Sequence, residues 1–390
     1  MSLSTVGVGY ERLPRAVRCN RHRCRRDGQR CCLSTPERGL DVLAIERFDI
    51  PHARGSSHGS TRIVRLTQPE NPSYVPLARA TFDNWRELEA ATGRDLLTTT
   101  GLIHASPADA DLFADARHSV ETHDVDHEVL TGMEVNERFP GYDLPSDHRA
   151  IYQPDGGFVD CEQAVIAHVE AAHAEGATIR ARERVLDWHE TGDGVRVKTD
   201  KNRYEADNLV VTAGAWAGDF FPGLASELTP CRRIMAWLQP AEPEQFQPET
   251  FPVFSLAGEH GDGYGFPIHD VSGFKFGREP SLPNAADPDE MPREPTTIEE
   301  ERHREFAEAY FPDGAGPTMQ LRTCVITESS DGHFVLGSHP HYDSVHVAAG
   351  FTGHGFKFTA VVGEILADFI VDGDTDHAVN LHRIDRLFDM

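Results

Sequence analysis

The sequence predicts an α/β fold in which a parallel sheet is interleaved with a second, mixed or antiparallel sheet. The run from Leu40 to Glu46 is apolar and closes on an acid, which is typical of a strand in a dinucleotide-binding βαβ unit. Residues 228–290 instead contain short strand-like runs separated by turns, which favours an antiparallel sheet. Strand-like and helix-like runs follow one another elsewhere, as an α/β protein requires.

Six runs have helical character. The clearest is Tyr74 to Thr92, where Leu77, Ala80, Trp85 and Leu88 form an apolar stripe at helical spacing. A run beginning at residue 161 is stopped by a glycine, and a final run is apolar throughout its length. The predicted helices are 74–92, 109–122, 133–139, 161–175, 298–310 and 360–371.

Strand-like runs are rich in β-branched and aromatic residues and are bounded by turn residues. Gly192 to Gly194 is one such turn, and residues 154–157 form another. The predicted strands are 40–46, 99–104, 150–153, 185–188, 195–199, 208–212, 231–238, 263–268, 273–276, 321–324 and 345–348.

The segment before residue 40 does not fit a βαβ unit. Such a unit needs a strand and a Gly-x-Gly-x-x-Gly turn about 20 residues before the acid, but Arg21 to Gly28 has neither. A one-base shift of reading frame explains this. Bases that encode residues 21–30, read one base later, can give Val-Ile-Gly-Val-Gly-Ala-Met-Gly-Ser, with glycines at positions 23, 25 and 28. The alternative is a natural basic arm.

Charge is divided unevenly along the chain. Residues 1–38 hold nine arginines and three acids, which leaves 28 of the 37 basic and 60 of the 63 acidic residues for the remainder. Such an acidic body repels nucleic acid and anionic membranes and suggests a halophilic protein. No apolar run of about 18 residues and no signal peptide is visible, and cysteines are sparse after residue 38, so we expect a cytoplasmic protein.

Three glycine-containing segments allow close approach of backbone to a ligand. They are the Gly/Ser/Thr-rich loop ending at Arg65, the turn Ala213 to Trp216, and the run Gly350 to Phe358 that opens the last helix. A helix opening can hold an anion, although the first two segments are equally compatible with plain turns. Only four lysines occur, and Lys275 and Lys357 both stand in Gly-Phe-Lys-Phe.

With these segments and Cys324 in Arg-Thr-Cys-Val, the chain resembles the monomeric sarcosine oxidase and N-methyltryptophan oxidase family, flavin amine oxidases related to D-amino-acid oxidase. The resemblance runs from about Gly39 to the C-terminus. We therefore expect an FAD-binding Rossmann-like domain interleaved with a substrate domain. The FAD domain would take residues 1–85, 150–220 and 318–390, with 1–38 out of frame, and the substrate domain residues 86–149 and 221–317.

The resemblance implies FAD joined covalently to Cys324, oxidation of a secondary amine such as sarcosine, and transfer of the electrons to O₂ to give H₂O₂. Arg65 and Lys357 match the pair that holds the substrate carboxylate, Lys275 matches the lysine that activates O₂, and Arg62 matches a residue near the flavin ring. No metal is implied, and a monomer is expected. Further positions expected at the cofactor are Glu46, Ser57, His58, Thr61, Val185, Trp216, Gly353, His354, Gly355 and Phe356.

The chain departs from the family pattern near the substrate. Glu279 stands where a histidine is common, Ile326 where a tyrosine is common, and Gly263 where one of two tyrosines is common. Another N-alkyl amino acid is therefore as compatible with the sequence as sarcosine. Two further alternatives stay open: an FAD-dependent amino-acid dehydrogenase with a different electron acceptor, and an inactive chain that has lost its pyrophosphate loop.

Overall fold

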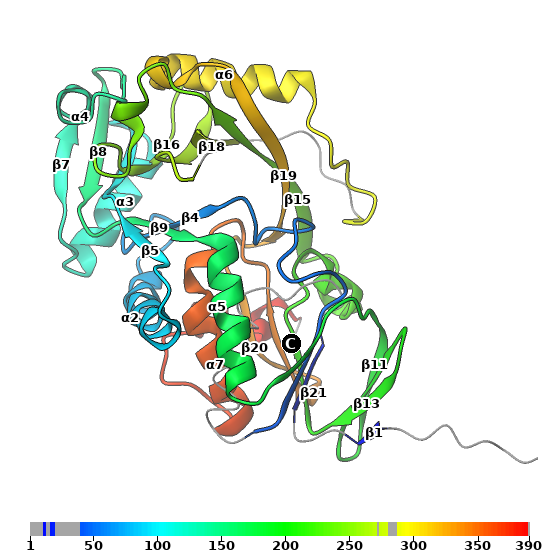
Figure 1. Cartoon of the computed structure of the whole chain (residues 1–390). Coiled ribbons are helices and arrows are strands. Elements are labelled where there is room, and N and C mark those ends of the chain that lie inside the picture. Colours follow the sequence, from blue (N-terminus) through cyan, green and yellow to red (C-terminus); the bar gives the residue numbers. More distant parts are fainter. Residues whose placement is uncertain (1–10, 13–15, 20–39, 271–272, 280–286, 389–390) are drawn as a thin grey trace, which may run out of the picture.

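A six-stranded sheet forms the lower half of the molecule in Figure 1. The computed structural model describes residues 11–12, 16–19, 40–270, 273–279 and 287–388. Four neighbouring pairs in this sheet are parallel, and only the last pair, β21 with β20, is antiparallel. In spatial order the strands are β10 (Thr178–Arg180), β3 (Val42–Ile45), β2 (Ala16–Cys19), β14 (Asn208–Val211), β21 (Tyr342–Ala349) and β20 (Val335–His339).

The central strand β2 corrects one expectation. Because residues 18–26 are rich in arginine, which is rarely buried on both faces of a sheet, the sequence predicts that the central strand is lost, yet residues 16–19 pair in parallel with β3 on one side and β14 on the other. Strand pairing is made by main-chain groups, which every non-proline residue supplies, so four residues suffice whatever their side chains. The glycine turn and the shifted-frame interpretation concern residues 20–39, which lie outside the described residues.

The two faces of the parallel sheet are covered differently. Along β14, Leu209 and Val211 pack toward the small four-stranded sheet, and Val210 between them packs toward helix α7. This is the alternation expected of a strand buried on both faces. The four-stranded sheet consists of β1 (Glu11–Arg12), β13 (Arg203–Ala206), β12 (Gly194–Thr199) and β11 (Val185–Thr191).

An eight-stranded mixed sheet forms the upper half. Its only parallel pair is β16 with β6. Phe274 and Phe276 pack toward helix α6 in an aromatic core, so Lys275 between them points to the opposite face. In spatial order the strands are β19 (Thr318–Ser329), β15 (Leu228–Leu238), β18 (Phe274–Glu279), β17 (Asp262–Phe266), β16 (Val253–Leu256), β6 (Leu102–Pro107), β8 (His148–Gln153) and β7 (Glu128–Thr131).

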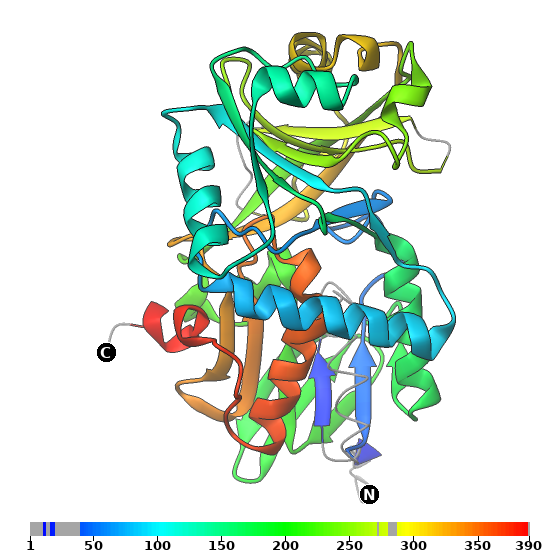
Figure 2. The same cartoon turned by 90° about the vertical axis from the view of Figure 1, so that its left-hand side faces the viewer.

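Helix α2 crosses the molecule between the two large sheets, as Figure 2 shows. A three-stranded sheet lies near it and comprises β4 (Thr61–Val64), β9 (Gly157–Asp160) and β5 (Leu97–Thr99). No helix in the described ranges is long and apolar enough to cross a membrane. The helices are α2 (Tyr74–Thr92), α3 (Asp111–Thr122), α4 (Gly132–Arg138), α5 (Cys161–Ala174), α6 (Thr297–Tyr310) and α7 (Thr359–Val371), with 3₁₀ turns η1 (Gly214–Asp219), η2 (Pro222–Leu224), η3 (Pro243–Phe246), η4 (Pro312–Gly314), η5 (Phe356–Phe358), η6 (Asn380–His382) and η7 (Ile384–Leu387).

All six predicted helices are present, and α2 has the predicted bounds. The predicted single strand 99–104 is two strands, because the chain turns at Gly101 and forms β5 before it and β6 after it. Gly101 has φ +76°, and a Cβ there would lie 2.6 Å from the Tyr152 ring. The loop expected to end at Arg65 contains strand β4 in its last residues. The sequence did not predict this strand, nor the strands β7, β9, β10, β13, β16 and β20.

The division into two domains stays a prediction. Strand pairing places β19, residues 318–329, on the eight-stranded sheet beside β15, although the predicted boundary assigned residues from 318 onward to the FAD domain. The chain thus passes between the sheets several times, and each sheet is built from distant parts of the sequence.

Candidate active site

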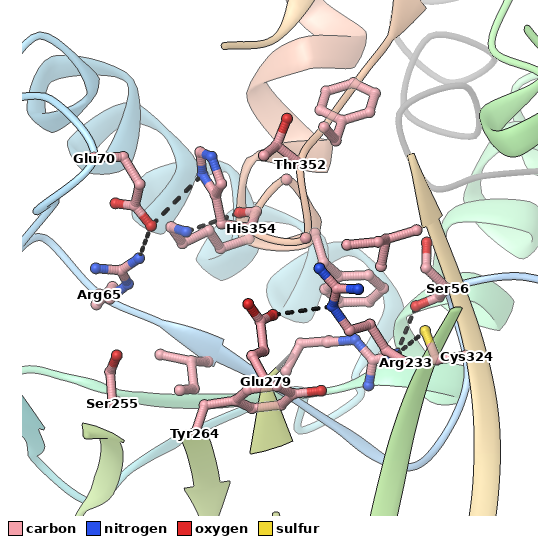
Figure 3. A pocket seen from close by; sticks show the side chains of 18 of the residues that line it. Ser56, Arg65, Glu70, Arg233, Ser255, Tyr264, Glu279, Cys324, Thr352 and His354 are labelled. Carbon is pink, nitrogen blue, oxygen red and sulfur yellow. Dashed lines mark hydrogen bonds and ion pairs between the residues drawn. The ribbon is translucent and has the colours of Figure 1, made fainter. Parts of the chain in front are cut away.

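A cavity of about 420 Å³ lies between the eight-stranded sheet, on its face opposite α6, and the segments that follow β3 and β21 (Figure 3). Ser255, Tyr264 and Ile326 contribute side chains from the sheet, and residues 351–357 contribute the glycine-containing turn that precedes α7. Nine of the residues predicted for the site line this one cavity: Ser57, Arg62, Arg65, Cys324, Gly353, His354, Gly355, Phe356 and Lys357.

Arg65 is buried where the chain leaves β4 and is held by three acceptors. It donates to the Thr67 carbonyl at 2.9 Å, to His104 Nε2 at 3.1 Å and to the Glu70 carboxylate. Burial and the neighbouring Arg65 keep the pKa of His104 well below its ordinary value, so the imidazole is neutral and can accept this hydrogen bond. The guanidinium is therefore fixed in position before any ligand arrives.

Lys357 is the second buried cation of the cavity. Its ammonium donates to the His354 carbonyl at 2.7 Å, while its own carbonyl accepts from Thr81 Oγ1 and Trp85 Nε1 on α2. Burial, together with Arg65, lowers the pKa of Lys357 well below its usual value. An anion bound between Lys357 and Arg65 would offset both effects and favour the charged amine.

Glu70 supplies the negative charge nearest to these cations. Burial alone would raise the pKa of its carboxyl, but Arg65, His354 and Lys357 outweigh burial and hold the pKa below its ordinary range. Glu70 is thus ionised at neutral pH, and it occupies one face of Arg65 in the way that a carboxylate ligand would. Figure 3 shows Glu70 between Arg65 and His354.

Arg62 connects Cys324 to the loop after β3. Its guanidinium donates to the carbonyls of Ser56 at 2.6 Å and His58 at 2.7 Å, and lies 4.0 Å from Cys324 Sγ. Cys324 is a buried free thiol on β19 that faces the cavity.

Lys275 lies behind the cavity wall. Its ammonium donates to the Thr61 carbonyl at 2.7 Å and to Thr61 Oγ1 at 3.0 Å, and lies 4.2 Å from the centroid of Phe266, which lines the cavity. Burial, and then the charge of Arg62, lower the pKa of Lys275 well below its ordinary value. The structure thus places Lys275 and Thr61 against the wall formed by Arg62 and Phe266.

Four other predicted residues lie away from the cavity. Glu46 is buried at the end of β3, Val185 begins β11, and Trp216 on η1 donates to Asp289 at 3.1 Å. His58 lies in the loop before β4 and contacts the Gly55 carbonyl at 2.9 Å through its Nε2. Glu46 and Trp216 follow β3 and β14 of the parallel sheet along the chain, whereas Val185 belongs to the four-stranded sheet.

Sequence reasoning missed three charged or polar residues of the site: Glu70, His104 and Arg233. Glu70 follows Arg65 by five positions in a segment without a motif, and His104 lies on β6, so only the fold brings them together. Arg233 on β15 lines the cavity and contacts Glu279. The sequence had marked Glu279 only as a departure from a family pattern.

A parallel sheet with an acid at a strand end, in a protein whose cavity holds two buried cations, is typical of a nucleotide-binding enzyme that takes an anionic ligand. The profile of the DAO family, described as FAD dependent oxidoreductase, matches residues 32–369. The chain belongs to this family of FAD-dependent oxidoreductases.

Individual relatives agree with this assignment. The chain is 35% identical over 355 residues to a monomeric sarcosine oxidase of Bacillus sp. (strain NS-129), covering 90% of this chain and 92% of that protein. It is 30% identical over 352 residues to the N-methyl-L-tryptophan oxidase of Escherichia coli (strain K12), covering 89% and 93%. The structure of NikD, an unusual amino acid oxidase, superposes with a TM-score of 0.84 at 24% identity and covers 97% of this chain and 98% of that one.

The residues present fit FAD. Glu46 is fully buried, and its Oε2 has no hydrogen-bond partner among the described residues, while Oε1 accepts from the Phe48 amide at 2.8 Å. A buried carboxylate oxygen without a partner is costly unless a ligand hydroxyl supplies the hydrogen bond. A ribose hydroxyl at the end of β3 is such a donor. Cys324, free and facing the cavity, fits the flavin end.

Proposed function

We propose that this protein oxidises a secondary amine that carries a carboxylate, sarcosine or another N-alkyl amino acid, and passes the electrons to O₂ to give H₂O₂. The observation that carries the proposal is the pair of buried cations, Arg65 and Lys357, facing one cavity together with Cys324. The printed names of the relatives, a sarcosine oxidase and an N-methyltryptophan oxidase, support the same class of substrate.

In this proposal Arg65 and Lys357 hold the substrate carboxylate. A carboxylate bridging the two cations has its orientation fixed, which fixes where the neighbouring amine and its N-alkyl carbon lie. Arg65 already contacts Glu70, so an arriving carboxylate competes with that contact. The net affinity is therefore a difference between two ion pairs and is smaller than the interaction of the new ion pair alone.

When bound, FAD would accept a hydride, that is two electrons and one proton, from the carbon next to the neutral amine, leaving an iminium ion that water hydrolyses to an aldehyde and the primary amine, and would pass the two electrons to O₂. The protein supplies electrostatics at that point. Arg62 in one wall of the cavity and Lys275 behind that wall are fixed cations, so charge that develops there during reduction of O₂ is stabilised without reorganisation. Burial of Lys275 strengthens this effect.

Peroxide production under air tests the proposal. The holoprotein, prepared in high salt, is given sarcosine and a series of N-methyl amino acids, and H₂O₂ and the aldehyde are measured together. Peroxide in proportion to aldehyde is expected. Aldehyde that forms only with an added electron acceptor would identify the dehydrogenase alternative. No flavin absorbance near 370 and 450 nm in the purified chain would identify the inactive alternative.

We propose that Cys324 is the covalent attachment site of FAD. Replacing Cys324 with serine is expected to leave protein from which FAD separates on acid precipitation, whereas the unaltered protein stays yellow after denaturation, because only a covalent bond survives loss of the fold. Cys231→Ser, in the same apolar cluster, is the matched control and should keep its colour. Complete release of FAD from the unaltered protein would exclude the attachment.

Restoring the N-terminal turn is expected to raise FAD loading. Arg23 and Arg25 carry side chains where close approach of backbone to a pyrophosphate requires glycine, and Arg26 stands where the shifted frame has alanine. Replacing residues 17–35 with the shifted-frame sequence should therefore increase the flavin bound per chain, measured by absorbance at 450 nm. Equal and near-stoichiometric flavin in both proteins would mean that the arginine-rich segment is the natural one.

We further propose a cytoplasmic monomer that works at high salt. The described cysteines Cys161, Cys231 and Cys324 form no disulfide bond, as in a reducing compartment. The large excess of acidic residues after residue 38 supports function at high ionic strength, where screening reduces their mutual repulsion. The curated relatives that are named monomeric support the oligomeric state.

A further inference from the structure

A second charged group lies on the sheet side of the cavity. Arg233 on β15 donates through Nε to Glu279 Oε1 at 3.1 Å, and through Nη2 to Glu328 Oε1 on the neighbouring strand β19. Arg233 and Glu279 both line the cavity. Figure 3 shows the Glu279 carboxylate projecting from its strand toward Arg233, with Arg65 and Glu70 at the other end of the view.

This group is negative overall and leaves Glu279 accessible. One arginine faces two carboxylates, and the side chain of Arg233 is only 12% exposed while that of Glu279 is 45% exposed. Asp262, the register partner of Glu279 on β17, also lines the cavity. The nearby Arg278 donates to the His260 carbonyl instead and does not line the cavity. The sheet therefore presents carboxylate charge to a ligand.

The cavity thus has two ends of opposite sign. Arg65 and Lys357 make one end attractive to a carboxylate, and Glu279 with Asp262 makes the sheet side attractive to a cation. A ligand with only one carboxylate and one amine would contact Arg65 and Lys357 and the place where the amine is oxidised, but not Glu279 or Asp262. A ligand that also carries a positive charge at the end of a side chain complements both ends.

We propose that Glu279, assisted by Asp262, binds a positively charged side-chain terminus of the substrate, so that the substrate class is the N-alkylated basic amino acids. This inference rests on the proposed function and narrows its substrate. Arg233 orients the Glu279 carboxylate through one oxygen and leaves the other available to an ammonium or guanidinium group.

Matched substrates test the inference. Nα-methyl-L-lysine and Nα-methyl-L-norleucine differ only in the terminal ammonium, so the ratio of their kcat/KM values measures what recognition of that charge contributes. A preference of about five- to tenfold for the lysine compound is expected, the scale of a half-exposed ion pair in a cavity. In Glu279→Gln the ratio should fall toward one. Exposed Glu305→Gln on α6, the same change away from the cavity, should keep it.

Two outcomes would overturn the inference. A preference for Nα-methyl-L-glutamate would show that Arg233, not Glu279, governs recognition. Equal loss of kcat/KM for the lysine and norleucine compounds in Glu279→Gln would place that carboxylate at the reacting amine rather than at the side chain.

Calorimetry separates the inference from the proposed function. The probes are 2-(methylthio)-6-aminohexanoate and 2-(methylthio)hexanoate, in which sulfur replaces the oxidisable nitrogen. Tighter binding of the first by the holoprotein, lost in Glu279→Gln, supports the inference even if no N-alkyl amino acid is oxidised. Equal binding of the two probes overturns the inference even if sarcosine is oxidised.

Discussion

Replacing Lys357 with methionine is expected to weaken the binding of carboxylate substrates and inhibitors by about 2–4 kcal/mol, the scale of breaking a buried charge contact. Lys357 is one of two buried cations at the cavity, and methionine keeps most of the length of the side chain while removing its charge. KM for sarcosine, and inhibition by acetate as a simple carboxylate, are the quantities to measure.

Lys198→Met is the matched control for this variant. Lys198 is exposed on β12, so its loss should change neither KM nor inhibition. Because burial lowers the pKa of Lys357, carboxylate binding should also weaken as pH rises and the ammonium loses its proton. In Lys357→Met that part of the pH dependence should vanish. An unchanged KM with unchanged inhibition would remove Lys357 from the carboxylate site.

The second large effect is expected for Lys275→Met, which should slow oxidation of the substrate-reduced protein by O₂ by about 10²-fold or more while leaving reduction by the amine nearly unchanged. Lys275 is a buried ammonium held against the cavity wall by Thr61. A fixed cation of this kind stabilises negative charge on oxygen. Stopped-flow absorbance at 450 nm measures the two half-reactions separately.

The pH profile gives this prediction a second readout. Since burial and Arg62 lower the pKa of Lys275, the unaltered protein should react with O₂ more slowly as pH rises through that pKa, and Lys275→Met should not show this fall. Lys201→Met, at an exposed site, is the control. Equal slowing of both half-reactions would assign Lys275 a general structural role.

Local sequence patterns were sufficient to predict the helices but not several of the strands. The apolar stripe of α2 repeats over 19 residues, which fixes both the type and the bounds of the element. Strand β16 has four residues, and its parallel partner β6 lies about 150 positions earlier in the chain. Nothing in so short a segment encodes which distant strand it joins, so its existence depends on the whole sheet.

The residues of the active site likewise divide into those that local sequence predicted and those that it did not. Arg65, Lys357 and Cys324 stand in recognisable motifs, and the fold brings them to one cavity. The residues that decide their charge state do not stand in motifs: His104 reaches Arg65 from β6, and Glu70 from a loop. Contacts between side chains far apart in sequence leave no local pattern, so the electrostatics of the cavity became visible only with the structure.

The six-stranded sheet has a consequence for how this protein is made. Its central strand β2 is formed by residues 16–19, but one of its flanking strands, β14, lies near residue 210 and the next, β21, near residue 345. During synthesis the first strand must wait for partners that leave the ribosome far later, so loop-closure entropy opposes early pairing. Most of the chain must therefore emerge before either large sheet can close, and both sheets are expected to fold in one late, cooperative step.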